Sequence, residues 1–275
     1  KGELNGEIVV KKKFISDGFS SLKDLHALQR EAWSMLLCQH PSVIRITGVC
    51  LHTLDLIMEC ASQGDLYSLL FDEIKSPIEW PYAITVALNI AEAISFFHAQ
   101  TPPLLHRDLK SPNIMLVAKS LKDSKDGIVA KIGDLGLTSV SSVTHLTRAE
   151  NPAWTAPEVM CGKYFNEKSD VYSFAMVLFE LTTRQHPFEE FNYKFCYQQM
   201  DDICQNHRRP TLPKKTPDSV RKLIESCWSD LPDSRPPFPS IVKSLIKIRE
   251  EHDTFPRLSE LHTQASSLSK VKYIQ

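Results

Sequence analysis

A stretch that is apolar on every side, from Trp80 to Ala99, constrains the fold of this chain more than any other feature. A helix of this kind cannot lie on a surface, so other elements must enclose it in a core. Residues 1–60 before it contain short β-branched runs typical of strands, interrupted by helical spacing of leucines at 21–38. After it come four more helical patterns, at residues 169–182, 191–206, 217–229 and 239–251. Strands first and helices afterwards predict an α+β fold.

Composition excludes several classes of protein. The 275 residues carry a formal net charge of -1, which indicates neither a nucleic-acid surface nor a charged tail. The seven cysteines are odd in number and include no Cys-x-x-Cys pair, so we predict no disulfide framework and no zinc site. A reducing compartment, and therefore a cytoplasmic location, is expected. The longest apolar runs are too short for a bilayer, so we expect no membrane segment in this domain.

The segment His106–Asn113 reads HRDLKSPN and places three chemically different groups on one short loop. Phosphoryl transfer requires a carboxylate that orients or deprotonates a hydroxyl, a cation that neutralises charge, and an oxygen ligand for Mg²⁺. Asp108, Lys110 and Asn113 supply these groups in that order. The segment resembles the catalytic loop of protein kinases, and the resemblance covers roughly residues 1–251.

Two further elements carry the resemblance. Asp134-Leu135-Gly136 is similar to the kinase element whose aspartate chelates Mg²⁺, with Leu in place of the usual Phe as an apolar plug. Ala156-Pro157-Glu158 is similar to the end of the kinase activation segment, and the resemblance pairs Glu158 with Arg235. The resemblance also makes Asp170 an anchor for the backbone of the catalytic loop, although a helix N-terminal charge would explain it too.

The residues 8–11, Ile-Val-Val-Lys, resemble the kinase strand whose lysine binds the α- and β-phosphates of ATP. Strand alternation puts Val9 and Lys11 on one face, so Val9 is expected to contact adenine. Lys12 and Lys13 are rivals by composition, and Lys13 shares the face of Lys11. The three apolar residues in front favour Lys11 as the phosphate-binding lysine.

The resemblance implies the remaining nucleotide contacts. Glu31 is the expected carboxylate partner of the lysine. Met58-Glu59-Cys60-Ala61 resembles the hinge between kinase lobes, where the backbone of Glu59 and Ala61 would recognise adenine. Met58 would be the gatekeeper that restricts the pocket behind the base.

Taken as a whole, the resemblance implies a bilobal protein-kinase fold: a small N-lobe with an antiparallel sheet and one helix, and a large, mainly helical C-lobe. We expect the N-lobe at residues 1–60, the C-lobe at 61–252 and a polar C-terminal extension at 253–275. Kinases carry a glycine-rich phosphate loop before the lysine strand, close to where this chain begins. We therefore expect that loop and the first strand to be missing, and the fragment to be weakly active.

The implied activity is transfer of the γ-phosphate of ATP, with Mg²⁺, to Ser or Thr hydroxyls of a protein substrate. A lysine two residues after Asp108 is the Ser/Thr pattern, and Asn151 and Cys227-Trp228 resemble the tyrosine-kinase-like group, which includes Roco, RAF and mixed-lineage kinases. The alternative is a pseudokinase that binds nucleotide or acts as a scaffold. Pseudokinases usually lack residues of the Lys11, Asp108 or Asp134 type, and all three are present here.

Six hydroxyl side chains crowd the expected activation segment: Thr138, Ser139, Ser141, Ser142, Thr144 and Thr147. A phosphate on one of them could pair with Arg107 and order the segment, so we expect control by phosphorylation in a signalling role. The alternative explanation is that flexible loops are commonly rich in Ser and Thr. Dimerisation through a longer parent protein is a further hypothesis.

Overall fold

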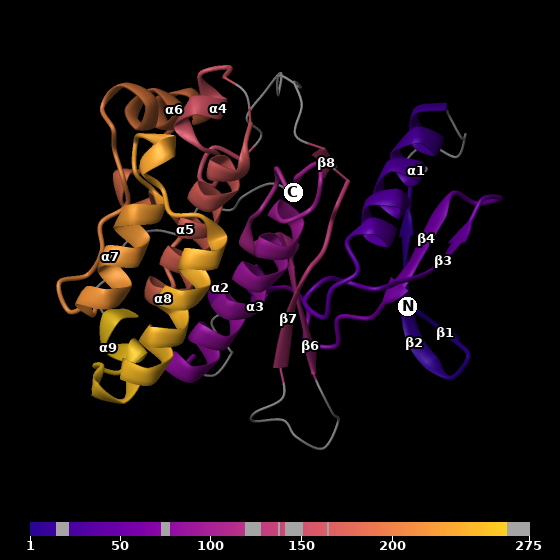
Figure 1. The fold of residues 1–275 in the computed structure, drawn as a ribbon, viewed down its shortest axis with the longest axis horizontal. Coiled ribbons are helices and arrows are strands. Elements are labelled where there is room, and N and C mark those ends of the chain that lie inside the picture. The colour runs from indigo at the N-terminus through magenta and orange to yellow at the C-terminus, as the bar shows by residue number, and fades with distance from the viewer. Residues whose placement is uncertain are drawn as a thin grey trace.

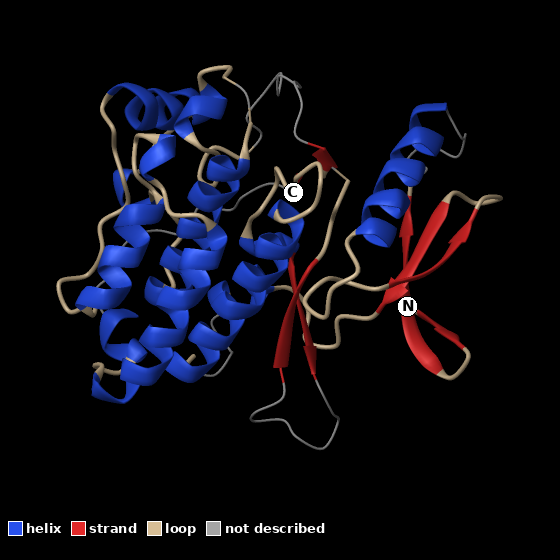
Figure 2. Ribbon diagram, in the orientation of Figure 1, coloured by secondary structure: helices blue, strands red, loops and turns tan. Residues whose placement is uncertain are grey.

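The structure is a computed structural model that describes residues 1–14, 22–72, 78–118, 128–136, 138–140, 151–163 and 165–262. These residues form two lobes, one built around a sheet and one built from helices (Figure 1). Figure 2 shows a sheet with one helix beside it on one side of the molecule and most of the helices on the other. The predicted α+β, bilobal architecture is therefore confirmed.

The N-terminal lobe is a four-stranded antiparallel sheet with one helix beside it. Its strands are β1 (Gly2–Leu4), β2 (Glu7–Lys13), β3 (Ile46–Cys50) and β4 (Asp55–Glu59), in the spatial order β1-β2-β4-β3. Asn5 and Gly6 join β1 to β2 with φ of 52° and 82°, the left-handed backbone of a two-residue hairpin turn. Helix α1 (Leu22–Leu37) packs against β3 and β4.

The C-terminal lobe is built around α3 (Trp80–His98), the enclosed apolar helix that the sequence predicts. It packs against α5 (Glu167–Thr183) and α8 (Phe238–Glu251). Among the described helices, α3 alone is long and apolar enough to cross a membrane, and its burial in this lobe accounts for that composition. The shorter helices are α2 (Leu66–Phe71), α4 (Pro157–Met160), α6 (Cys196–Gln205), α7 (Asp218–Cys227) and α9 (Leu258–His262).

Two pairs of short strands position the loops of the site. Strand β5 (Leu104–Leu105) pairs with β8 (Ser139–Val140). Strand β6 (Ile114–Ala118) pairs antiparallel with β7 (Ile128–Ile132), with the first residue of β6 opposite the last residue of β7. The residue before β6, Asn113, therefore lies at the same end of the pair as Asp134, which follows β7.

Two boundaries differ from the sequence prediction. The helix expected at 191–206 begins only at Cys196, because Asn192 adopts a φ of 49°, which a regular right-handed helix cannot accommodate. The C-terminal extension, whose docking the sequence left open, packs on the helical lobe as far as α9. The Trp80 indole donates to the Pro256 carbonyl at 2.8 Å. Residues 263–275 lie outside the described part of the chain.

Candidate active site

A buried carboxylate on α5 holds the loop between β5 and β6. Asp170 is fully buried and accepts hydrogen bonds from the backbone N–H groups of His106 at 2.9 Å and Arg107 at 3.0 Å. The ring nitrogen Nε2 of His98 lies 2.9 Å from the same carboxylate. Arg107 has a φ of 71°, and these bonds hold it in that unfavourable conformation. The expected anchoring contact of Asp170 is therefore present.

Asp108, Lys110 and Asn113 form one hydrogen-bonded cluster on this loop. Lys110 Nζ lies 2.8 Å from Asp108 Oδ2. The Asn113 amide nitrogen donates to the Asp108 carbonyl oxygen at 2.8 Å and to its Oδ2 at 2.9 Å. The side chains of Lys110 and Asp108 keep 17% and 21% of their surface exposed, so a substrate can reach them. The structure thus brings together the three groups that the sequence singled out.

Asp134 lies two residues after β7 and adopts a φ of 51°, which turns its side chain out while Leu135 is fully buried behind it. Its Oδ1 accepts a hydrogen bond from Lys12 Nζ at 2.9 Å. Burial by itself would raise the pKa of Asp134, but the hydrogen bond and charge of Lys12 outweigh it and lower that pKa below its ordinary value. Asp134 is therefore ionised at neutral pH.

Lys12, not Lys11, pairs with Glu31, so the prediction of Lys11 was wrong. Lys12 Nζ lies 2.8 Å from each oxygen of the Glu31 carboxylate. Lys11 Nζ instead contacts Asp55 at 2.8 Å. Burial acts to lower the pKa of Lys12, but the hydrogen bonds and charges of its two carboxylate partners outweigh it and raise that pKa. Lys12 therefore stays charged.

The register of the sheet explains this correction. In the antiparallel pair of β2 and β4, Lys12 lies opposite Leu56 and Lys11 lies opposite Ile57. Residues directly opposite one another share a face of the sheet. Leu56 is fully buried in the same core as Leu28 of α1, the helix that carries Glu31. Lys12 therefore points towards α1, and its neighbour Lys11 points to the other face.

The same alternation changes the expected adenine contact. Val9 is buried but shares the face of Lys11, whereas Val10 shares the face of Lys12 and lies opposite Met58. The residue on β2 that can contact adenine beside the phosphate-binding lysine is then Val10 rather than Val9. Val10 and Met58 are both partly buried.

An ion pair at the hinge segment connects the two lobes, and the sequence did not indicate it. Both carboxylate oxygens of Glu59 accept hydrogen bonds from Lys131 Nζ on β7, at 2.7 and 2.9 Å. Glu59 also accepts the backbone N–H of Arg45 at 2.7 Å. Its side chain is thereby committed, which agrees with the expectation that only backbone groups of Glu59 and Ala61 serve adenine. Those adenine contacts remain predictions.

A buried ion pair links the end of the activation segment to the helical lobe. Arg235 donates to both oxygens of Glu158, at 2.8 and 2.9 Å. Ser169 Oγ adds a hydrogen bond to the same carboxylate at 3.0 Å. The predicted pairing of Glu158 with Arg235 is thus present as a planar, two-bond contact.

Glu180 is a site residue that sequence reasoning missed. It is fully buried on α5 and bonds at the same time to Ser111 Oγ at 2.9 Å and to the indole nitrogen of Trp154 at 3.0 Å. It therefore joins the catalytic loop to the segment before α4. Burial raises the pKa of Glu180 to about 8. The available signal was an acidic residue inside the otherwise apolar helical run at 169–182.

Asn113, just before β6, and Asp134, just after β7, suit Mg²⁺. The Asn113 nitrogen is used by Asp108, which leaves the amide oxygen for a cation, and the ionised Asp134 supplies a carboxylate. Both are hard oxygen ligands of the kind that Mg²⁺ prefers. Within the described ranges, no group of three or more His, Cys, Asp or Glu could hold a metal ion. Two protein ligands leave the other positions of an octahedral Mg²⁺ site for water and phosphate oxygens.

The two lobes, the loop cluster and the Lys12–Glu31–Asp134 contact define a protein kinase domain. The sequence matches the family described as protein tyrosine and serine/threonine kinase over residues 2–245, and the chain belongs to this family. It is 37% identical over 257 residues to cyclic GMP-binding protein C of Dictyostelium discoideum, which covers 92% of this chain and 10% of that protein. The predicted resemblance to protein kinases is confirmed.

Two Roco proteins of the same organism are similarly close. Identity to the probable serine/threonine-protein kinase roco5 is 37% over 258 residues, covering 90% of this chain and 9% of that protein. Identity to the probable serine/threonine-protein kinase roco6 is 36% over 262 residues, covering 90% and 12%. The chain therefore spans only about a tenth of the length of the relatives that it matches.

Proposed function

We propose that this chain transfers the γ-phosphate of ATP to a Ser or Thr hydroxyl of a protein substrate. The observation that carries the proposal is a convergence of distant segments. The Asp108 cluster and the Lys12–Glu31–Asp134 contact meet where β6 begins and β7 ends, although Lys12 and Asp134 are 122 positions apart. The names of the Roco relatives support Ser and Thr as acceptors.

Asp108 is placed to act on the acceptor hydroxyl. Its Oδ2 is bonded to Lys110 and Asn113, and no described residue bonds to its Oδ1. That oxygen can accept the hydroxyl hydrogen and take the proton as the acceptor oxygen bonds to the γ-phosphorus, while the bond from this phosphorus to the β,γ-bridging oxygen breaks and ADP leaves. Lys110, 2.8 Å away, neutralises negative charge that develops on the transferring group.

Lys12 is placed to bind the nucleotide. Its ammonium can bind phosphate oxygens, and Glu31 holds the ammonium in position from α1. Asn113 and Asp134 would hold Mg²⁺, which, when bound, supplies positive charge at the bridging and terminal phosphate oxygens. Val10 would contact adenine from the same face of β2.

Replacing the acceptor-facing carboxylate tests the proposal. Asp108→Asn should lower the rate of labelled phosphate transfer from ATP by roughly 10²- to 10⁴-fold, because the amide cannot take a proton. The assay measures transfer to Ser/Thr-containing protein with Mg²⁺, followed by phosphoamino-acid analysis. Glu250→Gln, at an exposed carboxylate on α8, is the control and should retain full activity. Equal activity of the Asp108→Asn and unmodified chains, or phosphate only on Tyr, would contradict the proposal.

Location and regulation belong to the proposal as well. All seven cysteines are free thiols, which supports a reducing compartment such as the cytoplasm. Among the expected phosphorylation positions, the side chain of Thr138 is buried, whereas Ser141, Ser142, Thr144 and Thr147 lie outside the described residues. We place control by phosphorylation in the 141–147 segment. Phosphopeptide mapping of active protein that finds no phosphate there would contradict this part.

A further inference from the structure

Two aromatic side chains at the start of α6 are exposed. Phe195 keeps 57% of its surface accessible and Tyr197 keeps 65%. Their rings stack on each other with centroids 5.5 Å apart and planes tilted by 11°. This leaves apolar ring faces in water, although aromatic rings supply much of the contact energy when they are buried against a partner.

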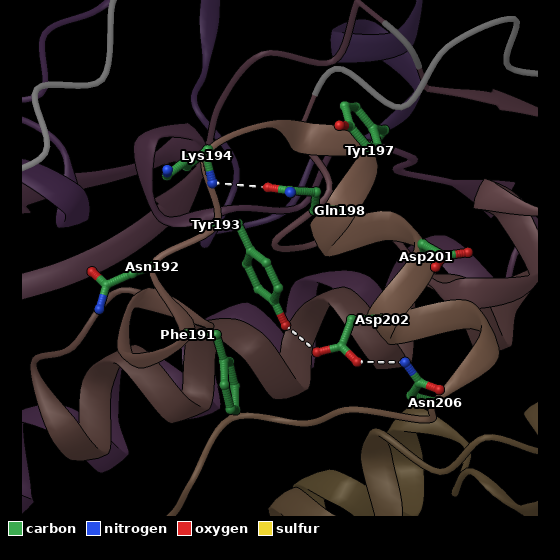
Figure 3. A pocket seen from close by; sticks show the side chains of 9 residues that line it. All are labelled: Phe191, Asn192, Tyr193, Lys194, Tyr197, Gln198, Asp201, Asp202 and Asn206. Atoms are coloured by element: carbon green, nitrogen blue, oxygen red, sulfur yellow. Dashed lines mark hydrogen bonds between the residues drawn. The ribbon is translucent and has the colours of Figure 1, made fainter.

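Tyr197 of this pair lines a hollow of about 760 Å³ between α6 and the loop in front of it, and Asp201 lines the same hollow (Figure 3). Asp202 lies in this hollow and is already saturated with partners: the Tyr193 hydroxyl donates to it, as do Asn206 at 2.8 Å and Arg208 at 3.2 Å. These bonds make Asp202 a fixed part of the wall rather than a free charge.

The loop that carries Phe195 is held in place before any partner arrives. Gln198 Oε1 accepts the backbone N–H groups of Lys194 at 3.0 Å and Phe195 at 3.2 Å. A surface that is already ordered loses less conformational entropy on binding than a flexible one. The pair of rings is thus a preorganised surface.

Asp201 supplies the charge that selects a partner. It is exposed and lies four residues after Tyr197, so the two side chains share a face of α6. No hydrogen bond or ion pair of its carboxylate to another described residue is present. Figure 3 shows Lys194 on the other side of the hollow from Asp201. A cation is therefore attracted to the end formed by Tyr197 and Asp201.

The chemistry of this end fits an arginine. The planar guanidinium group stacks on the faces of aromatic rings and forms two parallel hydrogen bonds with a carboxylate. An acidic segment or an anionic surface would be repelled by Asp201. A cationic segment of a protein, with arginine at the contact, is the occupant that matches both the rings and the charge.

The packing of α6 relates this surface to the part of the chain that is proposed to transfer phosphate. Helix α6 packs against α4, where Cys204 Sγ lies 3.7 Å from the Pro157 carbonyl oxygen and 3.9 Å from Met160 Sδ. Helix α4 contains Glu158 and ends the segment that leads away from the catalytic loop. Figure 1 shows α4 and α6 together at one end of the helical lobe.

We propose that Phe195, Tyr197 and Asp201, named here the α6 surface, bind an arginine-bearing segment of the protein substrate. This segment is separate from the residue that receives the phosphate. The identification of the partner as the substrate rests on the proposed kinase function, whereas the binding chemistry does not.

A binding experiment without nucleotide tests the chemistry directly. The probe is a fluorescein-labelled peptide with alternating Arg and Ala, free of Ser, Thr and Tyr, titrated with the 275-residue chain and followed by fluorescence polarisation. Two peptides of the same length carry Glu or neutral citrulline in place of Arg. The arginine peptide should bind at least roughly tenfold more tightly than either. Equal binding of the citrulline peptide would overturn the proposal.

Variants locate the binding on the molecule. Tyr197→Ala and Asp201→Asn should each weaken binding of the arginine peptide by roughly three- to tenfold, with unchanged thermal unfolding. The matched controls are Ile246→Ala and Glu250→Gln on α8, where an apolar residue 36% exposed and an exposed carboxylate are also four positions apart. Loss of binding in the control pair, or its retention in both α6 variants, would overturn the assignment.

A kinetic measurement connects the surface to the substrate. For a Ser/Thr peptide that carries the arginine segment at a distance, Tyr197→Ala should raise KM several-fold and leave kcat unchanged. For the same peptide without that segment, KM should not change. If the chain binds the arginine peptide but transfers no phosphate to any peptide, the proposed function fails and the binding surface stands. If transfer occurs but KM ignores the segment, the substrate assignment fails alone.

Discussion

Two of the contacts between a cation and a carboxylate in the site differ mainly in burial. The side chains of Arg235 and Glu158 keep 0% and 8% of their surface exposed. Those of Lys12 and Asp134 keep 35% and 45%. The first contact lies inside the helical lobe, and the second lies where a ligand can reach it. The same combination of a cation and a carboxylate therefore stabilises the fold in the first contact and is available to a ligand in the second.

The two cations, Arg235 and Lys12, also differ in how firmly their N–H groups are bound within the protein. Arg235 uses its planar group for Glu158, and also donates to the backbone carbonyls of Ser229 at 2.8 Å and Lys168 at 2.9 Å. Four of the five N–H donors of this guanidinium are thus bonded inside the protein. Lys12 carries a compact ammonium on a flexible stem, which can exchange a carboxylate for a phosphate oxygen. Four changes would break or sharpen this comparison.

The largest effect is expected in the buried pair. Arg235→Ala leaves Glu158 buried without its cation and should lower the free energy of unfolding by roughly 3–5 kcal/mol. Urea unfolding followed by circular dichroism measures this loss. A loss below about 1 kcal/mol would show that the burial of Glu158 does not make the pair essential.

The next effect concerns activity rather than stability. Lys12→Met should lower kcat/KM for phosphate transfer by at least roughly 10²-fold, about 2.7 kcal/mol in the barrier, since a charge on the phosphates is lost. Lys11→Met should not reduce kcat/KM, because Lys11 contacts Asp55 on the other face of β2. Steady-state kinetics of both variants decide which lysine binds the nucleotide. The reverse result, with Lys11→Met inactive, would contradict the structure.

The third test compares both pairs with Glu180, a buried carboxylate that bonds to the neutral side chains of Ser111 and Trp154. The Glu180 pKa of about 8 lies above its value in the unfolded chain, so folding takes up a proton between about pH 5 and 8. The contribution of Glu180 to stability should therefore fall with rising pH in this window, by at most about 1.4 kcal/mol per pH unit, and level off above it.

Glu180→Gln resembles the protonated side chain and can still bond to both Ser111 and Trp154. Its stability relative to the unmodified chain should therefore improve from pH 5 to 8, because contributions of all other groups cancel in the difference. Urea unfolding at several pH values measures this difference. A difference that is constant across the window would show that Glu180 does not titrate there.

The smallest effect is expected at a surface pair. Lys215 contacts Glu260 of α9 at 3.0 Å with 65% and 46% of the two side chains exposed. Lys215→Ala should change the free energy of unfolding by less than about 1 kcal/mol, because water screens exposed charges. Thermal unfolding at low and high salt measures the change. A loss similar to that of Arg235→Ala would remove burial as the explanation of the comparison.

The sequence predicted the groups whose positions depend on short-range spacing. Asp108, Lys110 and Asn113 lie on one loop, so their separation along the chain limits their separation in space. The enclosed helix at Trp80 was also predictable, because its composition excludes any surface position. The pairing of Glu158 with Arg235 came from family resemblance and not from spacing, since 77 positions separate them.

The failures depend on long-range contacts. The choice between Lys11 and Lys12 is made by the register of β2 against β4, which a three-lysine run does not encode locally. The role of Glu180 depends on two partners, Ser111 and Trp154, that are 69 and 26 positions away. In both cases the deciding information lies in another segment of the chain.

The contact between Asp170 and the catalytic loop has a consequence for local motion. Loops usually open more readily than the helices around them and exchange their amide hydrogens quickly. The amide hydrogens of His106 and Arg107 are held by a fully buried carboxylate of α5. They can exchange with solvent only when that helix is disturbed. The catalytic loop should therefore open as slowly as the interior of the helical lobe. Its conformation should stay the same when the surface around it fluctuates.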